Sequence, residues 1–141
     1  MIKKALLAAA MLAAGLAIGL PIARMDAAAQ QATQPTIKRT ILQRFDVPDS
    51  KYEVVLGVAE IPPNTTIGRH FHFGSEMGTL VEGDATLYVD GKAEQVMKPG
   101  DSYLVPEKVV HDAKSGPKGA KVMAVYTVLK GQPFATPAPA K

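Results

Sequence analysis

Short runs of β-branched, aromatic and other apolar residues alternate with pairs of turn-forming residues through most of this chain. Pro48-Asp49, Glu82-Gly83, Asp90-Gly91 and Pro99-Gly100 are such pairs. They favour turns because glycine adopts positive φ, proline fixes φ, and acidic side chains bond to nearby backbone. Almost no segment between them has apolar residues at helical spacing. The pattern therefore predicts an all-β domain built as a sandwich or a barrel.

The boundaries of the expected strands follow from the same pattern. Asp90-Gly91 predicts a tight type I′ hairpin, because that turn needs positive φ at both central residues. Elsewhere each run ends where Pro, Gly or Asn cluster. The expected strands are Lys38–Val47, Tyr52–Ile61, Ile67–Phe73, Glu76–Val81, Ala85–Val89, Lys92–Met97, Ser102–Val105, Val109–Ala113 and Ala120–Leu129.

Residues 1–29 have the layout of a secretory signal peptide. A positively charged start precedes an apolar stretch from Ala5 to about Ile22, and Ala27-Ala28-Ala29 supply small residues for cleavage before Gln30. This layout predicts a periplasmic or secreted protein that has no stable membrane association after cleavage. The alternative is an uncleaved N-terminal membrane anchor, because the apolar stretch is nearly long enough to span a bilayer.

The remaining chain divides into three parts. Residues 30–36 are polar and are expected to be a flexible lead-in, and residues 37–130 hold the expected strands. Residues 131–141 are rich in proline and are expected to form an extended arm that cannot continue a sheet. The chain has no cysteine, so it has neither a disulfide framework nor a thiolate ligand.

The charge of the chain excludes one class of partner. Three basic residues and one acidic residue lie in residues 1–29, so removing that segment lowers the net charge from +3 to +1. The basic character is therefore mostly that of the signal segment, and no nucleic-acid partner is predicted. A small molecule is the expected substrate or ligand.

The three histidines of the chain stand in a pattern that suits a metal ion. His70 and His72 form an H-x-H pair, Glu76 follows four residues later, and His111 lies far downstream. On a strand the two imidazoles of an H-x-H pair project from the same face. Burial of three imidazoles and a carboxylate without a shared partner would cost several kcal/mol. We therefore predict a transition-metal site with nitrogen and oxygen ligands.

The spacing of these residues resembles the first conserved motif of the cupin superfamily, G-x5-H-x-H-x3-E-x6-G. The chain has Asn64, His70, His72, Glu76 and Gly83 at the matching positions. Only the leading glycine differs. Asparagine tolerates positive φ better than most residues, so the turn at this position is expected to survive.

The second cupin motif, G-x5-P-x-G-x2-H-x3-N, is also matched in order. The chain has Gly100, Pro106, Lys108, His111 and Ser115 at its positions. Lys108 replaces a turn glycine, and Ser115 replaces an asparagine while keeping a polar side chain. Neither difference affects a ligand position. The resemblance covers roughly residues 36–129, which is nearly all of the chain that follows the predicted signal peptide.

The resemblance implies a fold and a cofactor. It implies a single cupin domain, a double-stranded β-helix or jelly-roll barrel, over residues 37–130. It also implies one divalent metal ion with one or two open coordination positions. Fe(II) is favoured, while Mn(II), Ni(II), Cu(II) and Zn(II) also suit such ligands. The implied metal ligands are His70, His72, Glu76 and His111.

The function that the resemblance implies is of the quercetin-dioxygenase-like kind, a metal-dependent oxidoreductase acting on a small organic molecule. Whether the chain is an enzyme stays open at this point. One alternative is a non-catalytic protein that binds a small molecule or a metal ion in the periplasm. Another is a partner-binding protein whose metal is structural. Small cupins commonly pair through β-strands, so a homodimer is expected, with the first strand or the tail as the exchanged element.

Three residues near the motif positions receive predictions of their own. Tyr103 is the candidate catalytic residue, because a tyrosine beside a metal can donate a proton or orient a bound oxygen. Tyr88 is a second candidate for this role. Arg69 precedes the first histidine, and strand alternation predicts that it points away from the metal into an ion pair.

Overall fold

The computed structural model describes residues 36–140, and among these residues it contains strands and their connections with no helix. No described residue therefore belongs to a helix that could cross a membrane. The predicted signal peptide and the lead-in up to residue 35 lie outside the described residues. The strands are β1 (Lys38–Asp46), β2 (Tyr52–Ile61), β3 (His70–Phe71), β4 (Gly74–Val89), β5 (Gln95–Met97), β6 (Ser102–Val105), β7 (His111–Leu129) and β8 (Thr136–Pro137).

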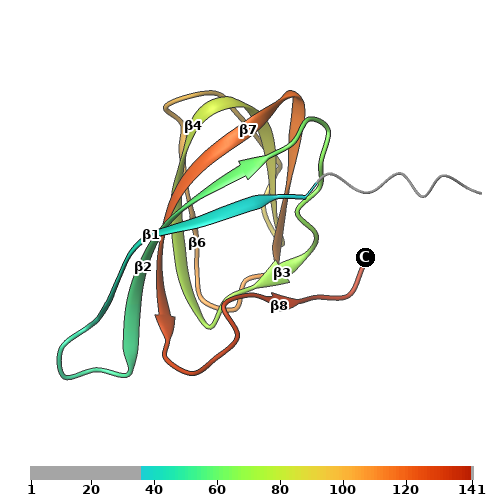
Figure 1. The fold of residues 1–141 in the computed structure, drawn as a ribbon. Coiled ribbons are helices and arrows are strands. Elements are labelled where there is room, and N and C mark those ends of the chain that lie inside the picture. The colour runs from blue at the N-terminus through green and yellow to red at the C-terminus, as the bar shows by residue number, and fades with distance from the viewer. Residues whose placement is uncertain (1–35, 141) are drawn as a thin grey trace, which may run out of the picture. The chain divides into compact units, whose positions relative to one another are not determined.

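The strands pair into one 8-stranded sheet that curves around a central core (Figure 1). The path of neighbours is β1-β2-β7-β3-β8, and β4 lies off this path, where it pairs with β5, β6 and β7. β4 and β7 are antiparallel and pair along most of their length, from Gly74 opposite Val128 to Val89 opposite His111. The predicted all-β fold is confirmed.

Two pairs of predicted strands are each one long strand. The segments expected at Glu76–Val81 and Ala85–Val89 are continuous in β4, because Glu82-Gly83 forms part of a bulged region and not a turn. Gly83 has a φ of 82°, and a Cβ at this position would overlap the Gly119 carbonyl. A bulge lets a strand bend without ending, so β4 can contribute to both layers of the barrel.

β7 likewise joins the strands expected at Val109–Ala113 and Ala120–Leu129. Pro117 lies between Ser115 and Ala120, the last and first residues that pair with β4 on either side of an unpaired stretch. Proline has no N–H to donate, and it is tolerated in a strand where no partner requires one. Pro117 therefore lies within β7 without ending it.

Two local predictions were wrong in detail. Of the H-x-H pair, His70 begins the two-residue strand β3 and His72 follows it, so no strand spans Ile67–Phe73. The residues before His70 are bound to β7 by isolated hydrogen bonds, such as the one that the Ile67 N–H donates to the Ala113 carbonyl. At Asp90-Gly91 only the glycine has positive φ. The β4–β5 hairpin therefore turns through a longer loop than a type I′ turn.

The C-terminal arm was predicted to stay out of the sheet, and this was also wrong. β8 pairs with β3, with Pro137 opposite His70 and Thr136 opposite Phe71. β8 is an edge strand, and an edge position tolerates proline because one side of the strand needs no donor. The arm therefore lies beside β3, the strand that His70 begins (Figure 1).

The core fills the interior between the layers. Leu80 and Val55 are 0% exposed and Val105 is 1% exposed. Along β4 burial alternates, with Glu76, Gly78 and Leu80 buried and the intervening Met77 and Thr79 exposed. This alternation is the expected consequence of a strand with one face toward the core, and it turns the Glu76 carboxylate inward.

Candidate metal centre

Four side chains from three parts of the sheet meet at one end of the barrel interior. They are His70 in β3, His72 just after it, Glu76 in β4 and His111 at the start of β7, and one ligand atom from each lies within 4.8 Å of all the others. His72, Glu76 and His111 are 3%, 6% and 3% exposed. The four predicted ligands are therefore brought together, three of them buried and His70 half-buried, as a group that could hold a metal ion.

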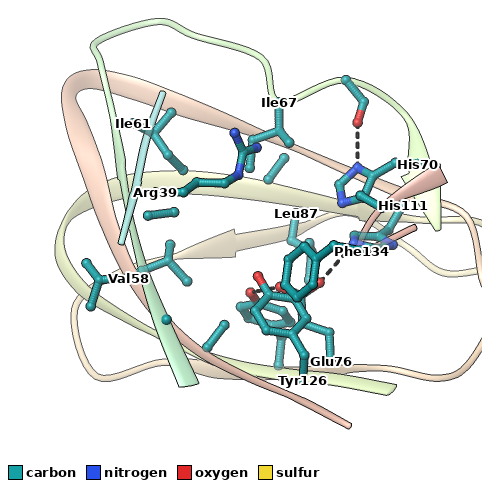
Figure 2. Close-up of a pocket in the computed structure, with 18 of the residues that line it drawn as sticks. Arg39, Val58, Ile61, Ile67, His70, Glu76, Leu87, His111, Tyr126 and Phe134 are labelled. Atoms are coloured by element: carbon teal, nitrogen blue, oxygen red, sulfur yellow. Dashed lines mark hydrogen bonds and ion pairs between the residues drawn. The ribbon is translucent and has the colours of Figure 1, made fainter. Parts of the chain in front are cut away.

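Backbone register brings these residues together. His111 lies opposite His70 on β3 and opposite Val89 on β4. Residues directly opposite in antiparallel strands have neighbouring side chains. The imidazole centroids of His70 and His111 are accordingly 4.2 Å apart. Figure 2 shows His70, His111 and Glu76 on the same side of a pocket.

Each histidine is oriented by a main-chain carbonyl. The Nδ1 atom of His70 donates to Gly68 O at 2.7 Å, that of His72 to Phe134 O at 2.5 Å, and that of His111 to Val109 O at 3.1 Å. A proton on Nδ1 leaves Nε2 with a lone pair, which is the form that binds metals. All three rings are therefore held ready to offer Nε2 as the ligand atom.

The arrangement around Glu76 needs a cation. Its Oε2 lies 3.0 Å from His72 Nε2 and 3.1 Å from His111 Nε2. With Nδ1 protonated, both of these nitrogens direct lone pairs at a carboxylate oxygen, and such contacts repel unless a proton or a metal ion lies among them. The nitrogen and oxygen donor set suits a divalent transition metal. The residues present therefore fit the metal that the motifs imply.

The electrostatics of the group agree with this description. Burial alone would raise the pKa of Glu76, but the adjacent His111 and His72 rings and the Tyr103 hydroxyl outweigh it and hold that pKa well below its usual range. Burial lowers the pKa of His70, and the neighbouring imidazoles lower it further. Glu76 is thus an anion and His70 a neutral base at neutral pH, as ligands of a divalent cation must be. Burial would lower the pKa of His111, but its contact with Glu76 outweighs burial and raises that pKa, so a bound metal ion would have to displace a proton from this ring.

Tyr103, the predicted catalytic residue, lies beside Glu76. Its hydroxyl donates to Glu76 Oε1 at 2.5 Å. Burial, and then the Glu76 charge, raises the pKa of Tyr103, so the phenol keeps its proton. Gly78 lies opposite Tyr103 in the β4–β6 pair, and a Cβ at Gly78 would overlap the phenol. Its catalytic role stays a prediction.

Tyr88, the other tyrosine considered, is not brought to the site. It is 40% exposed and lies on the outward face of β4. Residues of β4 at even positions change from the inner to the outer face after the bulges at Leu80/Glu82 and Gly83/Ala85. A rule of simple alternation across the whole strand does not allow for such shifts.

Two aromatic residues of the site were missed by sequence reasoning. Tyr126 lies opposite Glu76 in the β4–β7 register, and its ring centroid is 5.2 Å from that of His72. Phe134 packs on Tyr126 at 4.5 Å. A correct pairing of β7 with β4 would have indicated Tyr126. No motif signalled Phe134, which contacts His72 through its main-chain carbonyl and through its ring, because it lies 62 residues further along the chain in the C-terminal arm.

Arg69 behaves as the sequence predicted. Its guanidinium binds Asp90 through two nitrogens, at 2.9 and 2.7 Å, and its Nε donates to Pro139 O at 2.9 Å. The Ala138 N–H donates to the Arg69 carbonyl. Arg69 thus connects the C-terminal arm to the β4–β5 loop instead of binding the metal.

The positions that differ from the cupin motifs keep the local geometry. Asn64 and Lys108 have φ values of 53° and 59°, so both turns keep the left-handed conformation that glycine would favour. The Ser115 hydroxyl donates to Pro62 O at 2.5 Å and accepts from the Thr65 N–H. Loop geometry around the site is therefore maintained without the usual residues.

A pocket of about 620 Å³ leads from the surface to this centre. Its lining is mainly apolar, and it includes His70, Glu76, His111, Tyr103 and Tyr126. The volume lies within the range of small-molecule sites. Small residues make room for it, notably Gly57, Ala59, Ala113 and Ala124.

Comparison with known proteins identifies the family. Residues 57–132, more than half of the chain, match the family model described as Cupin domain. The match includes all four candidate ligands and Tyr103. No curated protein matches the chain.

Solved structures with similar folds support the architecture. A cupin superfamily protein from Desulfitobacterium hafniense has 16% identity and a TM-score of 0.57, over 67% of this chain and 80% of its own. KdgF from a Halomonas species has 20% identity and a TM-score of 0.57, over 72% and 86%. The DMSP lyase DddQ from Ruegeria pomeroyi has 14% identity and a TM-score of 0.61, over 72% of this chain and 51% of its own. At these identities the likeness shows the fold alone.

Proposed function

This chain belongs to the cupin domain family, and on that premise we propose that it is a metal-dependent cupin that acts on a small organic molecule. Its divalent metal, with Fe(II) favoured, is held by His70, His72, Glu76 and His111. The reaction is of the dioxygenase kind, in which both atoms of dioxygen enter the substrate.

The observation that carries this proposal is the orientation of the three imidazoles. Each Nδ1 is bonded to a carbonyl, so each Nε2 is free to bind a metal beside the Glu76 carboxylate. The centre also opens onto a pocket of about 620 Å³. A structural metal site is usually closed by its protein ligands, whereas a catalytic site keeps a position for substrate.

A metal bound here would supply Lewis acidity and, as Fe(II), a means of activating dioxygen. The chain's own residues have separate tasks. Tyr103 orients Glu76 through a 2.5 Å hydrogen bond and holds a proton beside the centre. Tyr126 and Phe134 pack together over His72 and exclude water from that side.

Metal analysis tests the proposal most directly. Protein purified from its native compartment is expected to contain one divalent metal per chain, and the Fe(II)-loaded protein is expected to consume oxygen with an aromatic or polyphenolic compound. Full metal loading without oxygen uptake across a broad panel would contradict the dioxygenase reaction. A His72→Ala variant that kept a full equivalent of metal would contradict the ligand set.

The alternative is capture of a small molecule without turnover. The apolar lining of the pocket favours it, because such a lining binds ligands whether or not chemistry follows. Calorimetry would show ligand binding in this case, while mass spectrometry would show the ligand unchanged.

We also propose a homodimer that forms through β1. This strand pairs only with β2 among the described residues, and all nine of its residues are exposed. Ile41, Leu42 and Phe45 are 57%, 44% and 57% exposed. An unpaired edge with apolar side chains favours pairing with the same strand of a second copy about a two-fold axis. β8 already pairs within its own chain, so β1 is preferred over the tail as the dimer element.

Export is the proposed location, on the sequence of residues 1–29 alone. Mass spectrometry of the protein from a periplasmic fraction is expected to give a chain that begins at Gln30. A full-length chain in the membrane fraction would favour the uncleaved anchor instead.

A further inference from the structure

The pocket above the metal centre contains one positive charge that no residue neutralises. Its charged lining residues are Arg39, Arg69 and Glu76. Arg69 is paired with Asp90, and Glu76 belongs to the metal centre. The Arg39 guanidinium forms no hydrogen bond or ion pair with another of residues 36–140.

Backbone register directs Arg39 inward. Arg39 lies opposite Ala59 in the β1–β2 pair, and Ile41 lies opposite Gly57. Directly opposed residues share a face of the sheet, and Ala59 and Gly57 both line the pocket. Figure 2 shows the Arg39 side chain reaching into the pocket from β1, on a different side from Glu76 and Tyr126.

The surroundings of Arg39 strengthen its attraction for an anion. Most of the residues that line the pocket are apolar, including Val58, Ile61, Ile67 and Leu87. Arg39 is itself exposed, so it lies at the solvent end of the pocket, and the apolar walls beside it focus its field and raise the local concentration of anions there. A divalent metal would carry more positive charge than Glu76 offsets, so the occupied pocket would be positive at both ends.

Arg39 shares its pocket with the metal centre. The candidate ligands His70, Glu76 and His111 line the same pocket as Arg39. Arg39 and the residues beside the metal centre therefore act on the same space. A ligand between them would contact both.

We propose that Arg39 binds the carboxylate of an organic acid whose apolar body fills the pocket between β1 and the metal centre. An arginine fits a carboxylate with two parallel hydrogen bonds, which fixes orientation as well as charge. This inference rests on the proposed function for the identity of the reacting end, but the acid-binding contact itself needs only Arg39 and the pocket.

Calorimetry with matched acids and amides tests the contact. The probes are benzoate and 3-phenylpropionate, with benzamide and 3-phenylpropionamide as neutral counterparts. Each is titrated into the Zn(II)-loaded protein, because zinc has no redox chemistry, and into the metal-free protein. The variants are Arg39→Gln and, as control, Arg44→Gln, which lies on the same strand, pairs with Glu53 and does not line the pocket.

The wild type is expected to bind each acid about 10- to 100-fold more tightly than its amide, as a charged hydrogen bond would give. R39Q is expected to lose this preference, and R44Q to keep it. Because Arg39 is not one of the residues that bind the metal, the preference for acid over amide is expected to persist in the metal-free protein.

Three results would overturn the inference: equal binding of acids and amides by the wild type, binding of neither, or a preference that survives in R39Q. The last result would mean that the metal itself holds the carboxylate. Failure of the wild type to bind zinc would instead contradict the proposed function and leave the Arg39 contact to be judged on the metal-free titration.

Discussion

The two ends of the sheet path, β8 and β1, are both edge strands and are built in opposite ways. β8 has two residues, contains a proline and is fixed by the contacts of Arg69 with Pro139 and Ala138. β1 has nine residues, all exposed, and pairs only with β2 among the described residues. Short edges with proline resist further pairing, whereas long exposed ones invite it.

The difference also extends to function. The segment leading into β8 supplies the Phe134 carbonyl that orients His72. β1 supplies Arg39, which faces the pocket without a partner in residues 36–140. One edge therefore completes the centre, while the other leaves groups available for a ligand and for a second copy of the chain.

Removing the arm tests the first half of this contrast and should have the largest effect. A chain ending at Gly131 lacks the Phe134 carbonyl, so His72 loses the partner that fixes its Nδ1 proton. Loss of such outer partners lowers metal affinity by about 10- to 100-fold. Competition with a chelator would measure the change, and a chain lacking only residues 140–141 is the control. Unchanged affinity after removal of the arm would show that it has no part in the centre.

A substitution away from β1 and β8 provides a reference for the loss of metal affinity expected on removal of the arm. Tyr103→Phe removes the hydrogen bond to Glu76 and is expected to lower metal affinity or turnover by about tenfold. Tyr88→Phe is the matched control, because Tyr88 is exposed on the outer face. The same chelator assay applies. Equal values for the two variants would mean that the Tyr103 bond does not support the centre.

The open edge is tested by a charge on β1. Phe45→Asp places a carboxylate on the exposed strand and is expected to reduce the mass from two chains to one in light scattering, because like charges would face each other in a two-fold pair. Val96→Asp changes a residue of β5 that is 75% exposed and should leave the mass unchanged. A wild-type mass of one chain would contradict the dimer.

The smallest expected effect is local. Arg69→Gln removes the two-pronged contact with Asp90 and the bond to Pro139, so the arm should open more often. Hydrogen exchange at the Ala138 amide, which donates to Arg69 O, should become faster. Arg44→Gln breaks a looser pair, 3.5 Å from Glu53 on the β1 side, and should not change that exchange. Equal exchange in both variants would mean that Arg69 does not hold the arm.

Much of the fold could be predicted where signals were local. The bounds of β2 and β6 agree with the runs Tyr52–Ile61 and Ser102–Val105, because apolar patterning and turn residues mark strand ends directly. The bulges of β4 and β7 could not be predicted in the same way. A turn-forming pair such as Glu82-Gly83 can end a strand or bend it, and the pairing with the neighbouring strand decides between these two outcomes.

The candidate site divides along the same line. The sequence by itself determined the choice of the four candidate ligands and of Tyr103 as a candidate beside them, because their chemistry and spacing are properties of side chains along one chain. Only the tertiary structure decided that the Phe134 carbonyl orients His72, that Tyr126 lies beside Glu76, and that Arg39 faces the pocket. These contacts depend on the register between strands that are distant in sequence and on main-chain atoms that every residue carries. Neither can be recognised from a sequence motif.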